Sequence, residues 1–349
     1  MLRLTKLRTL LQQEEVDGIF VKGDTSIRYF TGFTGGESLL YVDQENILLI
    51  TDSRYTLQAK NQAHGCKVIE HKDGFWSEVA KLKLGTRLAL DGDYFSYSEQ
   101  CYLAKAQPEA RWKNLELSLL RQMKSPEEIE LIKRAVAISD EAFAQLIPHI
   151  KVGLREETLA AMLEYNMRML GSEAMVFTTI VASGKRGSLP HGVASPKQIE
   201  QGELVTFDFG ATYQGYRSDI TRTVAVGRIE PWQREIYHIV LAANLLGEQK
   251  VKPGVSGAYV DGVVRKFIAG KGYGAYFGHG LGHGVGLDIH EQPVLNRRNV
   301  KPLPVNAIVT VEPGIYLPNQ GGVRIEDTVL VTSEGCLRLT EAPKELLEL

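Results

Sequence analysis

The stretch VTFDFGATYQGYRSDITRT, residues 205–223, places two aspartates in a part of the chain that is otherwise apolar and strand-like. Asp208 lies between Phe207 and Phe209, and Asp219 stands just before a second strand-like run. Aspartate is disfavoured inside strands and costly to bury without a partner. If the two strands are adjacent, the two carboxylates would repel each other unless a cation lay between them. The alternative is a pair of turn aspartates at strand ends, which suits Asp219 better than Asp208.

Two glutamates repeat this pattern near the C-terminus. Glu312 directly follows the apolar run in VTVEPGIY (309–316), and Glu326 interrupts GGVRIEDTVLV (321–331). In both places a carboxylate stands where a core residue is expected. A buried ion pair is the alternative explanation for Glu326, with Arg324 as its partner.

Histidine and glycine are crowded into FGHGLGHGVGLDIHE, residues 277–291, which holds His279, His283 and His290 together with five glycines. Glycine lets the backbone approach another group closely, and histidine is a common metal ligand and proton carrier. The stretch therefore indicates a site where backbone and imidazoles converge on an ion or a substrate. A turn with surface histidines, or a weak adventitious metal binder, is the alternative.

Together these segments offer four carboxylates and one imidazole, a ligand set suited to Mn²⁺, Co²⁺, Zn²⁺ or Fe²⁺. Five ligands are too many for a single catalytic zinc with an open position. They suit two ions that share carboxylates and lie about 3.5–4 Å apart, an arrangement typical of hydrolases. The candidate ligands are Asp208, Asp219, His283 (or a neighbouring histidine), Glu312 and Glu326.

The composition is that of an ordinary globular protein: 349 residues, 23% of them charged, with a formal net charge of −2. That balance gives no reason to expect nucleic acid or a membrane surface as a partner. The three cysteines lie far apart in the sequence, so neither a disulfide framework nor a structural zinc site is indicated. The N-terminus lacks a signal-peptide pattern and no apolar run approaches 18 residues. We therefore expect a cytoplasmic protein.

Strand-like and helix-like segments alternate over the first 120 residues, which predicts an α/β domain. Ser125, Pro126 and Glu128 form a capping-box pattern that predicts the start of a long helix. We place the domain boundary before that helix, giving an N-terminal domain at 1–122 and a second domain at 123–349. The second domain reads as α+β, with 321–331 as a strand-like run.

These motifs resemble those of the pita-bread metallopeptidases, a group that includes methionine aminopeptidase, prolidase and Xaa-Pro aminopeptidase. The family's ligand order of Asp, Asp, His, Glu and Glu is matched in DFG, SDITRT, GHGVG, EPG and RIED. The resemblance covers nearly the whole chain and implies a creatinase/prolidase-like α/β domain followed by an α+β pita-bread catalytic domain. It also implies that the metal ligands are Asp208, Asp219, His283, Glu312 and Glu326.

The resemblance further implies roles in catalysis and substrate binding. Glu312 matches the glutamate beside the bridging water and is the candidate general base. His191, in SLPHG, matches a substrate-binding histidine that shuttles protons; from the residues alone, it is an ordinary loop histidine. His279 and His290 match histidines lining the substrate pocket of the proline-specific branch and count as catalytic candidates. Arg324 is also expected to bind substrate.

The function expected from this resemblance is metal-dependent Xaa-Pro aminopeptidase activity, in which water bridging two metal ions attacks the bond before a proline. IRYFTGFTG (27–35) and LITDSRYTLQA (49–59) resemble the N-terminal domains of short bacterial Xaa-Pro aminopeptidases. We expect two ions per subunit, Mn²⁺ first with Co²⁺ or Zn²⁺ as alternatives, short peptides with proline in second place as substrates, and a homodimer. An Xaa-Pro dipeptidase (prolidase) is the alternative enzyme, and a non-catalytic binding protein on the same fold is the alternative of another class.

Overall fold

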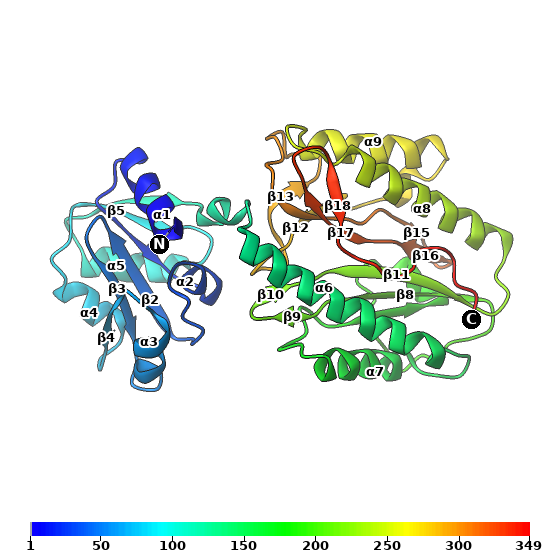
Figure 1. The fold of residues 1–349 in the computed structure, drawn as a ribbon, viewed down its shortest axis with the longest axis horizontal. Coiled ribbons are helices and arrows are strands. Elements are labelled where there is room, and N and C mark those ends of the chain that lie inside the picture. Colours follow the sequence, from blue (N-terminus) through cyan, green and yellow to red (C-terminus); the bar gives the residue numbers. More distant parts are fainter. Residues whose placement is uncertain (1) are drawn as a thin grey trace. The chain divides into compact units, whose positions relative to one another are not determined.

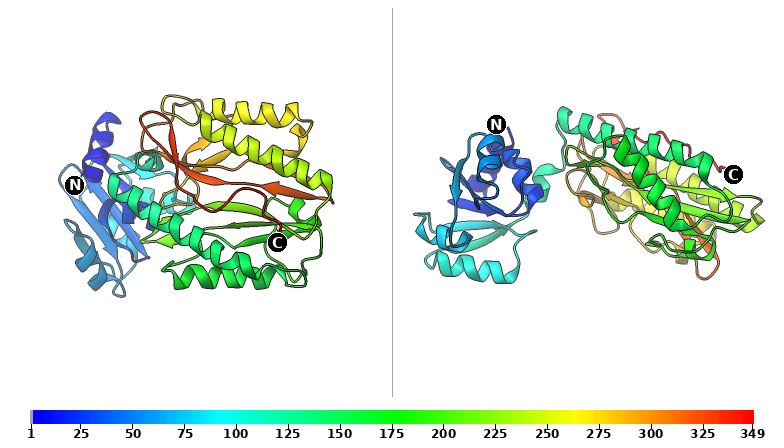
Figure 2. Two further views of the ribbon diagram at one scale, coloured as in Figure 1. Left: turned by 45° about the vertical axis from the view of Figure 1, so that its right-hand side comes forward. Right: turned by 90° about the horizontal axis from the view of Figure 1, so that it is seen from below.

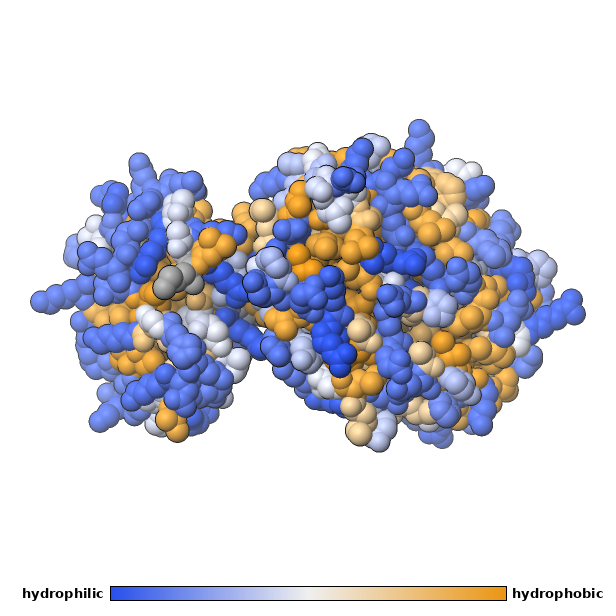
Figure 3. All heavy atoms as spheres, in the orientation of Figure 1, coloured by the Kyte–Doolittle hydropathy of each residue, from blue (hydrophilic) through white to orange (hydrophobic). Residues whose placement is uncertain are grey.

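The computed structural model describes residues 2–349, and the chain divides between Arg121 and Gln122 into two compact units. Within residues 2–349 no helix is both long enough and apolar enough to cross a membrane. On the face drawn in Figure 3, hydrophilic residues cover much of the surface of each unit, and hydrophobic areas lie among those residues.

The N-terminal unit is built on a mixed six-stranded sheet with strand order β4-β3-β2-β1-β5-β6. The β1–β2 and β2–β3 pairs are antiparallel, and the β1–β5, β3–β4 and β5–β6 pairs are parallel. The strands are β1 (Gly18–Val21), β2 (Ser38–Asp43), β3 (Ile47–Thr51), β4 (Lys67–Glu70), β5 (Arg87–Asp91) and β6 (Arg111–Leu115).

Helices cover this sheet, as Figure 1 shows. Leu39 and Tyr41 of β2 pack in one cluster with Val79 and Leu103 of the helices. Leu40 of the same strand points to the opposite face and is also buried. Burial on both faces is why these strands read as continuous apolar runs. The helices are α1 (Leu2–Gln13), α2 (Asp24–Thr31), α3 (Thr56–Gln62), α4 (Phe75–Lys81) and α5 (Tyr97–Ala106), followed by the 3₁₀ turn Leu117–Arg121.

The second unit begins with the capped helix that the sequence predicts. Ser125 Oγ accepts from the Glu128 N–H at 3.3 Å, and the Glu128 carboxylate accepts from the Ser125 N–H at 2.9 Å. This capping box, with Pro126 as the first helical residue, confirms the predicted helix start. The helices of this unit are α6 (Pro126–Leu146), α7 (Glu156–Met169), α8 (Pro231–Lys250) and α9 (Gly257–Gly270), with 3₁₀ turns at Ile147–His149, Gly184–Ser188 (η3) and Gly274–Tyr276.

Two main sheets lie between these helices, a three-stranded one ordered β11-β8-β7 and a five-stranded one ordered β13-β12-β14-β17-β18. Two further pairs, β9–β10 and β15–β16, are short hairpins. The strands are β7 (Ile180–Ser183), β8 (Glu203–Phe209), β9 (Thr212–Tyr213), β10 (Tyr216–Arg217), β11 (Ile220–Val226), β12 (Gly282–Gly284), β13 (Glu291–Leu295), β14 (Ile308–Val311), β15 (Gly314–Leu317), β16 (Gly321–Arg324), β17 (Asp327–Val331) and β18 (Cys336–Arg338).

Each sheet has its own helix pair and its own core. Buried residues of α6 and α7 pack with β7, β8 and β11 in one cluster, and those of α8 and α9 pack with β14, β16 and β17 in another. Figure 1 and the left view of Figure 2 show the pair α8 and α9 apart from the pair α6 and α7, with strands between them. The second unit thus contains two layers of strands, each packed against its own pair of helices.

The run 321–331, predicted as one strand-like segment, is interrupted. β16 pairs with β15, β17 pairs with β14 and β18, and Glu326 lies in the gap between them. The reason is a contact with β11. The Glu326 N–H donates to the Thr221 carbonyl of β11 at 3.1 Å and does not join the β15–β16 or the β14–β17 ladder. This break sets Glu326 beside β11, which follows Asp219.

Candidate active site

Five acidic and imidazole side chains from five different segments of the second unit were predicted to form a site. Asp208 lies in β8, Asp219 immediately before β11, His283 in β12, Glu312 immediately after β14 and Glu326 between β16 and β17. Asp219, His283 and Glu326 each offer one ligand atom, and these atoms lie within 4.8 Å of one another. Glu312 Oε1 lies 3.5 Å from His283 Nε2, so four of the five residues converge.

His283 presents its Nε2 atom to the carboxylates. Its Nδ1 atom lies 3.1 Å from the Gly284 carbonyl, which can only accept, so Nδ1 carries the proton. Burial lowers the pKa of His283 to about 3, which keeps the ring neutral. Nε2 therefore points a lone pair at Asp219 Oδ2, 3.4 Å away, and at Glu312. A lone pair facing carboxylates is unfavourable without a cation, and a backbone-oriented imidazole is a typical metal ligand.

The distances fit ligands of a common ion. Atoms bound to one tetrahedral ion at about 2 Å lie about 3.3 Å from each other. The His283–Asp219 and His283–Glu312 separations of 3.4 and 3.5 Å match this value and are long for hydrogen bonds. The donor set of carboxylate oxygens with one imidazole also suits a divalent transition metal.

Unsatisfied oxygens and altered acidities mark the same place. Asp208 Oδ1 and Asp219 Oδ1 are buried and have no hydrogen-bond partner within residues 2–349. Burial and then the nearby carboxylates raise the pKa of Asp219 and of Glu312 well above the usual range, and that of Glu326 to about 8. Several buried carboxylates cannot all stay ionised without a counter-charge. Bound cations would supply that charge, so these residues fit a metal centre.

Asp208, the fifth candidate ligand, is held by Arg324. The Arg324 guanidinium donates through Nη2 to Asp208 Oδ2, through Nη1 to Tyr316 and to the Pro190 carbonyl, and through Nε to Thr221 Oγ1. These contacts use four of the five N–H groups of an arginine. The Arg324 side chain is 4% exposed, so it acts as a buried clamp inside the site, and its role in substrate binding stays a prediction.

His279 is fixed through both ring nitrogens. Nδ1 lies 2.8 Å from the Gly280 carbonyl, and Nε2 lies 2.9 Å from the Tyr316 hydroxyl. Because the Gly280 carbonyl can only accept, Nδ1 is the donor and Tyr316 donates to Nε2. Burial lowers the pKa of His279 to about 4. His279 is therefore a neutral ring joined through Tyr316 to Arg324, and not an available acid at neutral pH.

The other two candidate histidines, His191 and His290, are exposed. His290 packs edge-on against the metal-ligand candidate His283, with ring centroids 4.3 Å apart. His191 follows Pro190, whose carbonyl accepts from Arg324 at 2.9 Å. The structure therefore brings His290 directly to the carboxylate site and ties the segment carrying His191 to it through the backbone.

Buried Glu156 of α7 fastens the loop that carries His191. Its carboxylate accepts from the Ser183 N–H at 2.7 Å and the Ser195 hydroxyl at 2.6 Å, residues that flank the loop on either side. It also pairs with Arg186 in η3 at 2.9 Å. An exposed histidine is thus mounted on a loop whose base is rigid.

Two threonines belong to the site although the sequence reading did not select them. Thr221 Oγ1 donates to Glu326 at 2.7 Å, and Thr310 Oγ1 lies 3.4 Å from Glu312 and accepts from the His283 N–H. Thr221 stands two residues after Asp219, and Thr310 two residues before Glu312. Side chains two apart on a strand share a face, so this spacing was the available signal.

Two glycines of 277–291 lie where β12 closely approaches neighbouring backbone. A Cβ on Gly282 would lie 2.0 Å from the Thr310 carbonyl oxygen, and one on Gly284 would lie 2.6 Å from that of Gln292. Both glycines thus allow close approach to neighbouring backbone on either side of β12, which seats His283 deep between strands.

Comparison with known proteins agrees with this fold and site. Residues 130–333 match the model of metallopeptidase family M24, and residues 3–123 match that of the creatinase/prolidase N-terminal domain. The chain therefore belongs to metallopeptidase family M24 and is a peptidase of the hydrolase class, with a creatinase-type N-terminal domain and the pita-bread catalytic fold. The predicted family and fold class are confirmed, and the family implies divalent metal ions as cofactors.

Similar proteins span the full chain. An Xaa-Pro dipeptidase of Pyrococcus furiosus is 41% identical over 350 residues, covering 99% of both chains. The structure of an Xaa-Pro dipeptidase from Bacillus anthracis matches with a TM-score of 0.95 and 42% identity, covering 99% of both chains. That of an X-Pro aminopeptidase from Thermotoga maritima matches with a TM-score of 0.92 and 40% identity, again covering 99% of both. Both kinds of activity occur among relatives of similar identity.

Proposed function

We propose that this chain is a two-metal Xaa-Pro aminopeptidase, which hydrolyses the bond between an N-terminal residue and a following proline. The observation that carries the proposal is the convergence of Asp219, His283 and Glu326 within 4.8 Å, with buried carboxylate oxygens that lack partners among the described residues. Asp208 and Glu312 complete the proposed ligand set.

Divalent ions held there would polarise the scissile carbonyl and lower the pKa of water. Mn²⁺ is the proposed ion, with Co²⁺ or Zn²⁺ as alternatives, because carboxylate oxygens dominate the ligand set. Glu312 is the proposed general base. Its side chain is 18% exposed, against 5% for Asp219 and 13% for Asp208, so it is the most accessible of the three to water and substrate.

His191 is the proposed donor to the leaving proline nitrogen. An X–Pro amide has no N–H and leaves as a secondary amine, so it benefits from a nearby proton or hydrogen-bond donor. His191 is exposed, whereas His279 already uses both ring nitrogens. His279 and His290 are proposed to line the pocket for the proline side of the substrate. Arg324 would support the site indirectly, because its guanidinium holds Asp208 and Tyr316 in place.

The proline preference rests on the relatives named Xaa-Pro dipeptidase and X-Pro aminopeptidase. The name Xaa-Pro dipeptidase also gives the alternative, an enzyme that cleaves Xaa-Pro dipeptides and rejects longer peptides. A non-catalytic binding protein is set aside, because the chain belongs to a peptidase family and retains all five candidate ligands. The proposal also includes a homodimer, which the family resemblance suggests, and the cytoplasmic location expected from the sequence.

The test is product analysis by mass spectrometry on matched Xaa-Pro-Yaa, Xaa-Pro and Xaa-Ala-Yaa peptides with Mn²⁺ present. Release of free Xaa from Xaa-Pro-Yaa, with little cleavage of the alanine peptide, supports the aminopeptidase. Cleavage of Xaa-Pro alone would assign the chain as a dipeptidase. Equal rates on the proline and alanine tripeptides would refute the proline specificity.

A further inference from the structure

Asn244 of α8 reaches the backbone immediately before both glutamates of the site. Its Nδ2 atom donates to the Val311 carbonyl at 2.9 Å and to the Ile325 carbonyl at 3.5 Å. Val311 precedes Glu312 and Ile325 precedes Glu326. The amide is fully buried, so each of its hydrogen bonds is made within the protein.

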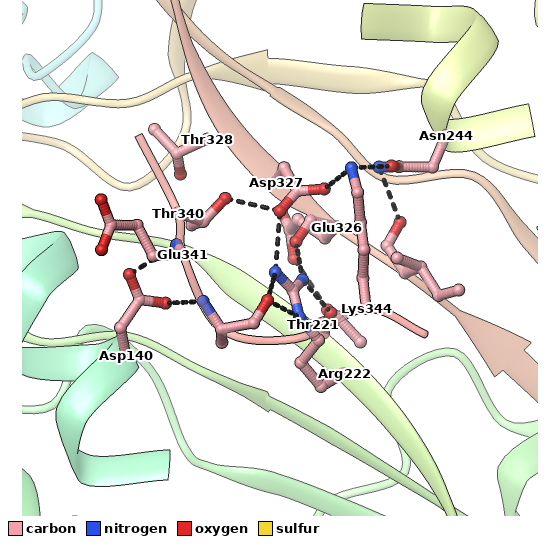
Figure 4. Close-up of polar contacts among 12 residues, drawn as sticks. Asp140, Thr221, Arg222, Asn244, Glu326, Asp327, Thr328, Thr340, Glu341 and Lys344 are labelled. Atoms are coloured by element: carbon pink, nitrogen blue, oxygen red, sulfur yellow. Dashed lines mark hydrogen bonds and ion pairs between the residues drawn. The ribbon is translucent and has the colours of Figure 1, made fainter. Parts of the chain in front are cut away.

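Lys344, near the C-terminus, fixes which way this amide points. Its Nζ atom donates to Asn244 Oδ1 at 2.7 Å, to Glu248 Oε1 at 2.8 Å and to Asp327 Oδ2 at 2.8 Å. An ammonium group only donates, so Asn244 must turn its oxygen to Lys344 and its NH₂ group to the two carbonyls. Figure 4 shows Lys344 lying between Asn244 and Asp327. The position thus needs one acceptor and two donors, which an asparagine supplies.

This contact falls where the strand ladder fails. The β14–β17 ladder ends at the pair Val311–Asp327, and the β15–β16 ladder begins at Gly314–Arg324. Glu312 and Glu326 lie in the gap between the two ladders. The Glu312 N–H donates to the Leu281 carbonyl, just before β12, and the Glu326 N–H donates to the Thr221 carbonyl of β11. Within this gap the Ile325 N–H donates to the Pro313 carbonyl at 3.4 Å, and the Asn244 side chain adds a second link between the two segments.

The far side of Glu326 is also held by buried charge. Arg222 Nη1 donates to the Glu326 carbonyl, and Arg222 Nη2 pairs with Asp327 Oδ1 at 2.8 Å. Figure 4 shows Arg222 and Asp327 on the same network as Lys344. Burying ions rarely increases stability over apolar packing, so such a network is better explained by the geometry it imposes.

We propose that Asn244, oriented by Lys344, is a positioning residue that sets the spacing of Glu312 and Glu326 and thereby the affinity for the bound ions. The inference rests on the proposed metal function. Outer partners of metal ligands typically change affinity by about 10- to 100-fold when they are removed. Asn244 acts through the backbone and touches neither substrate nor ion.

The test measures Co²⁺ binding to metal-free protein by calorimetry and by visible absorption. Asn244→Ala should bind at least one ion about 10-fold more weakly, with an altered Co²⁺ spectrum. Asn244→Asp, of equal size, should do the same, because it replaces the donor by an oxygen facing the carbonyls, and it decides the matter if the alanine variant fails to fold. Asn166→Ala is the matched control: Asn166 also donates to a backbone carbonyl, Ala142 at 3.2 Å, but joins α7 to α6. It should lose stability and keep wild-type binding.

Wild-type affinity and spectrum in folded Asn244→Ala or Asn244→Asp, while the wild type binds ions, would overturn the positioning role and leave the proposed function standing. A change of equal size in Asn166→Ala would also overturn it, because a general loss of stability would then suffice. Failure of the wild type to bind any ion would instead overturn the proposed function, and this inference with it.

Discussion

Asp219 and Glu326 stand 107 positions apart in the sequence, yet a carboxylate oxygen of one lies within 4.8 Å of a carboxylate oxygen of the other. Two charges at that separation repel by roughly 3 kcal/mol at the effective dielectric constant of a protein. Burial raises the pKa of both groups further. Holding the two carboxylates together therefore lowers the stability of the metal-free fold. Such a loss of stability is expected at a functional site that a cation completes.

We expect Asp219→Asn to make the metal-free protein more stable, by about 1–3 kcal/mol, because it removes one of the repelling charges. The same change should abolish most peptidase activity and the stabilisation that added Mn²⁺ gives the wild type. Thermal unfolding with and without Mn²⁺ measures both effects. Asp140→Asn is the control. Asp140 accepts from two backbone N–H groups, at 2.8 and 2.9 Å, and is not one of the candidate ligands, so this variant should still be stabilised by Mn²⁺. An Asp219→Asn protein that gains full stabilisation from Mn²⁺ would contradict the ligand assignment.

The histidines should separate by role. His283→Ala should lower metal content, since Nε2 faces the carboxylates. His191→Ala should keep the metal and lose turnover, by about 100-fold if it is the proton donor. Metal analysis and steady-state kinetics on the same preparations distinguish these outcomes. Equal metal loss in both variants would show that the roles are wrongly divided.

Tyr316→Phe tests the relay from Arg324 to His279. The Tyr316 hydroxyl accepts from Arg324 and donates to His279, at 2.9 Å in each case. Without it, His279 loses its contact at Nε2 and keeps that of Nδ1 with the Gly280 carbonyl, whereas Asp208 keeps its bond from Arg324. We expect unchanged metal affinity and a reduced kcat/KM for Xaa-Pro peptides. Weaker metal binding together with a wild-type kcat/KM at saturating metal would contradict the role of Tyr316 in orienting His279.

Asp91, in the N-terminal unit, should make stability depend on pH. Burial raises its pKa to about 6, and one of its oxygens accepts from Ser26 at 2.9 Å. The folded state therefore retains a proton that the unfolded state releases near pH 4, so stability falls as pH rises from about 4 to about 6. Asp91→Asn mimics the protonated form. Its gain in unfolding free energy over wild type should grow from near zero at about pH 4 to about 3 kcal/mol at neutral pH.

Urea unfolding of both proteins across this pH range measures that difference. Comparing variant with wild type at each pH cancels the titration of all other groups. A gain that stays constant with pH would mean that Asp91 does not carry the effect.

Much of this architecture could be predicted because its signals are local. The apolar runs at 18–21 and 87–91, and the capping box at Ser125, depend on neighbours in sequence and correspond to β1, β5 and the start of α6. The candidate ligands could be selected for a related reason. A carboxylate inside an apolar strand, as with Asp208, conflicts with its surroundings, and that conflict can be read without a structure.

The relationships that could not be predicted are those between distant segments. The break between β16 and β17 arises because Glu326 bonds to Thr221, and the apolar pattern of 321–331 gives no sign of it. Asn244 looks like any polar residue of α8 until its carbonyl partners are known. Tyr316 likewise depends on its position between His279 and Arg324, which only the folded chain defines.

The central claim, that the carboxylate cluster is a working metal centre, is tested most directly by titrating metal back into depleted protein. Divalent ions are removed with a chelator, Mn²⁺ is added in steps, and bound metal and Xaa-Pro hydrolysis are measured on the same samples. We predict negligible hydrolysis without metal, and activity that rises as ions bind and levels off at no more than two per chain. Full hydrolysis by protein shown to be free of divalent metal would contradict the account.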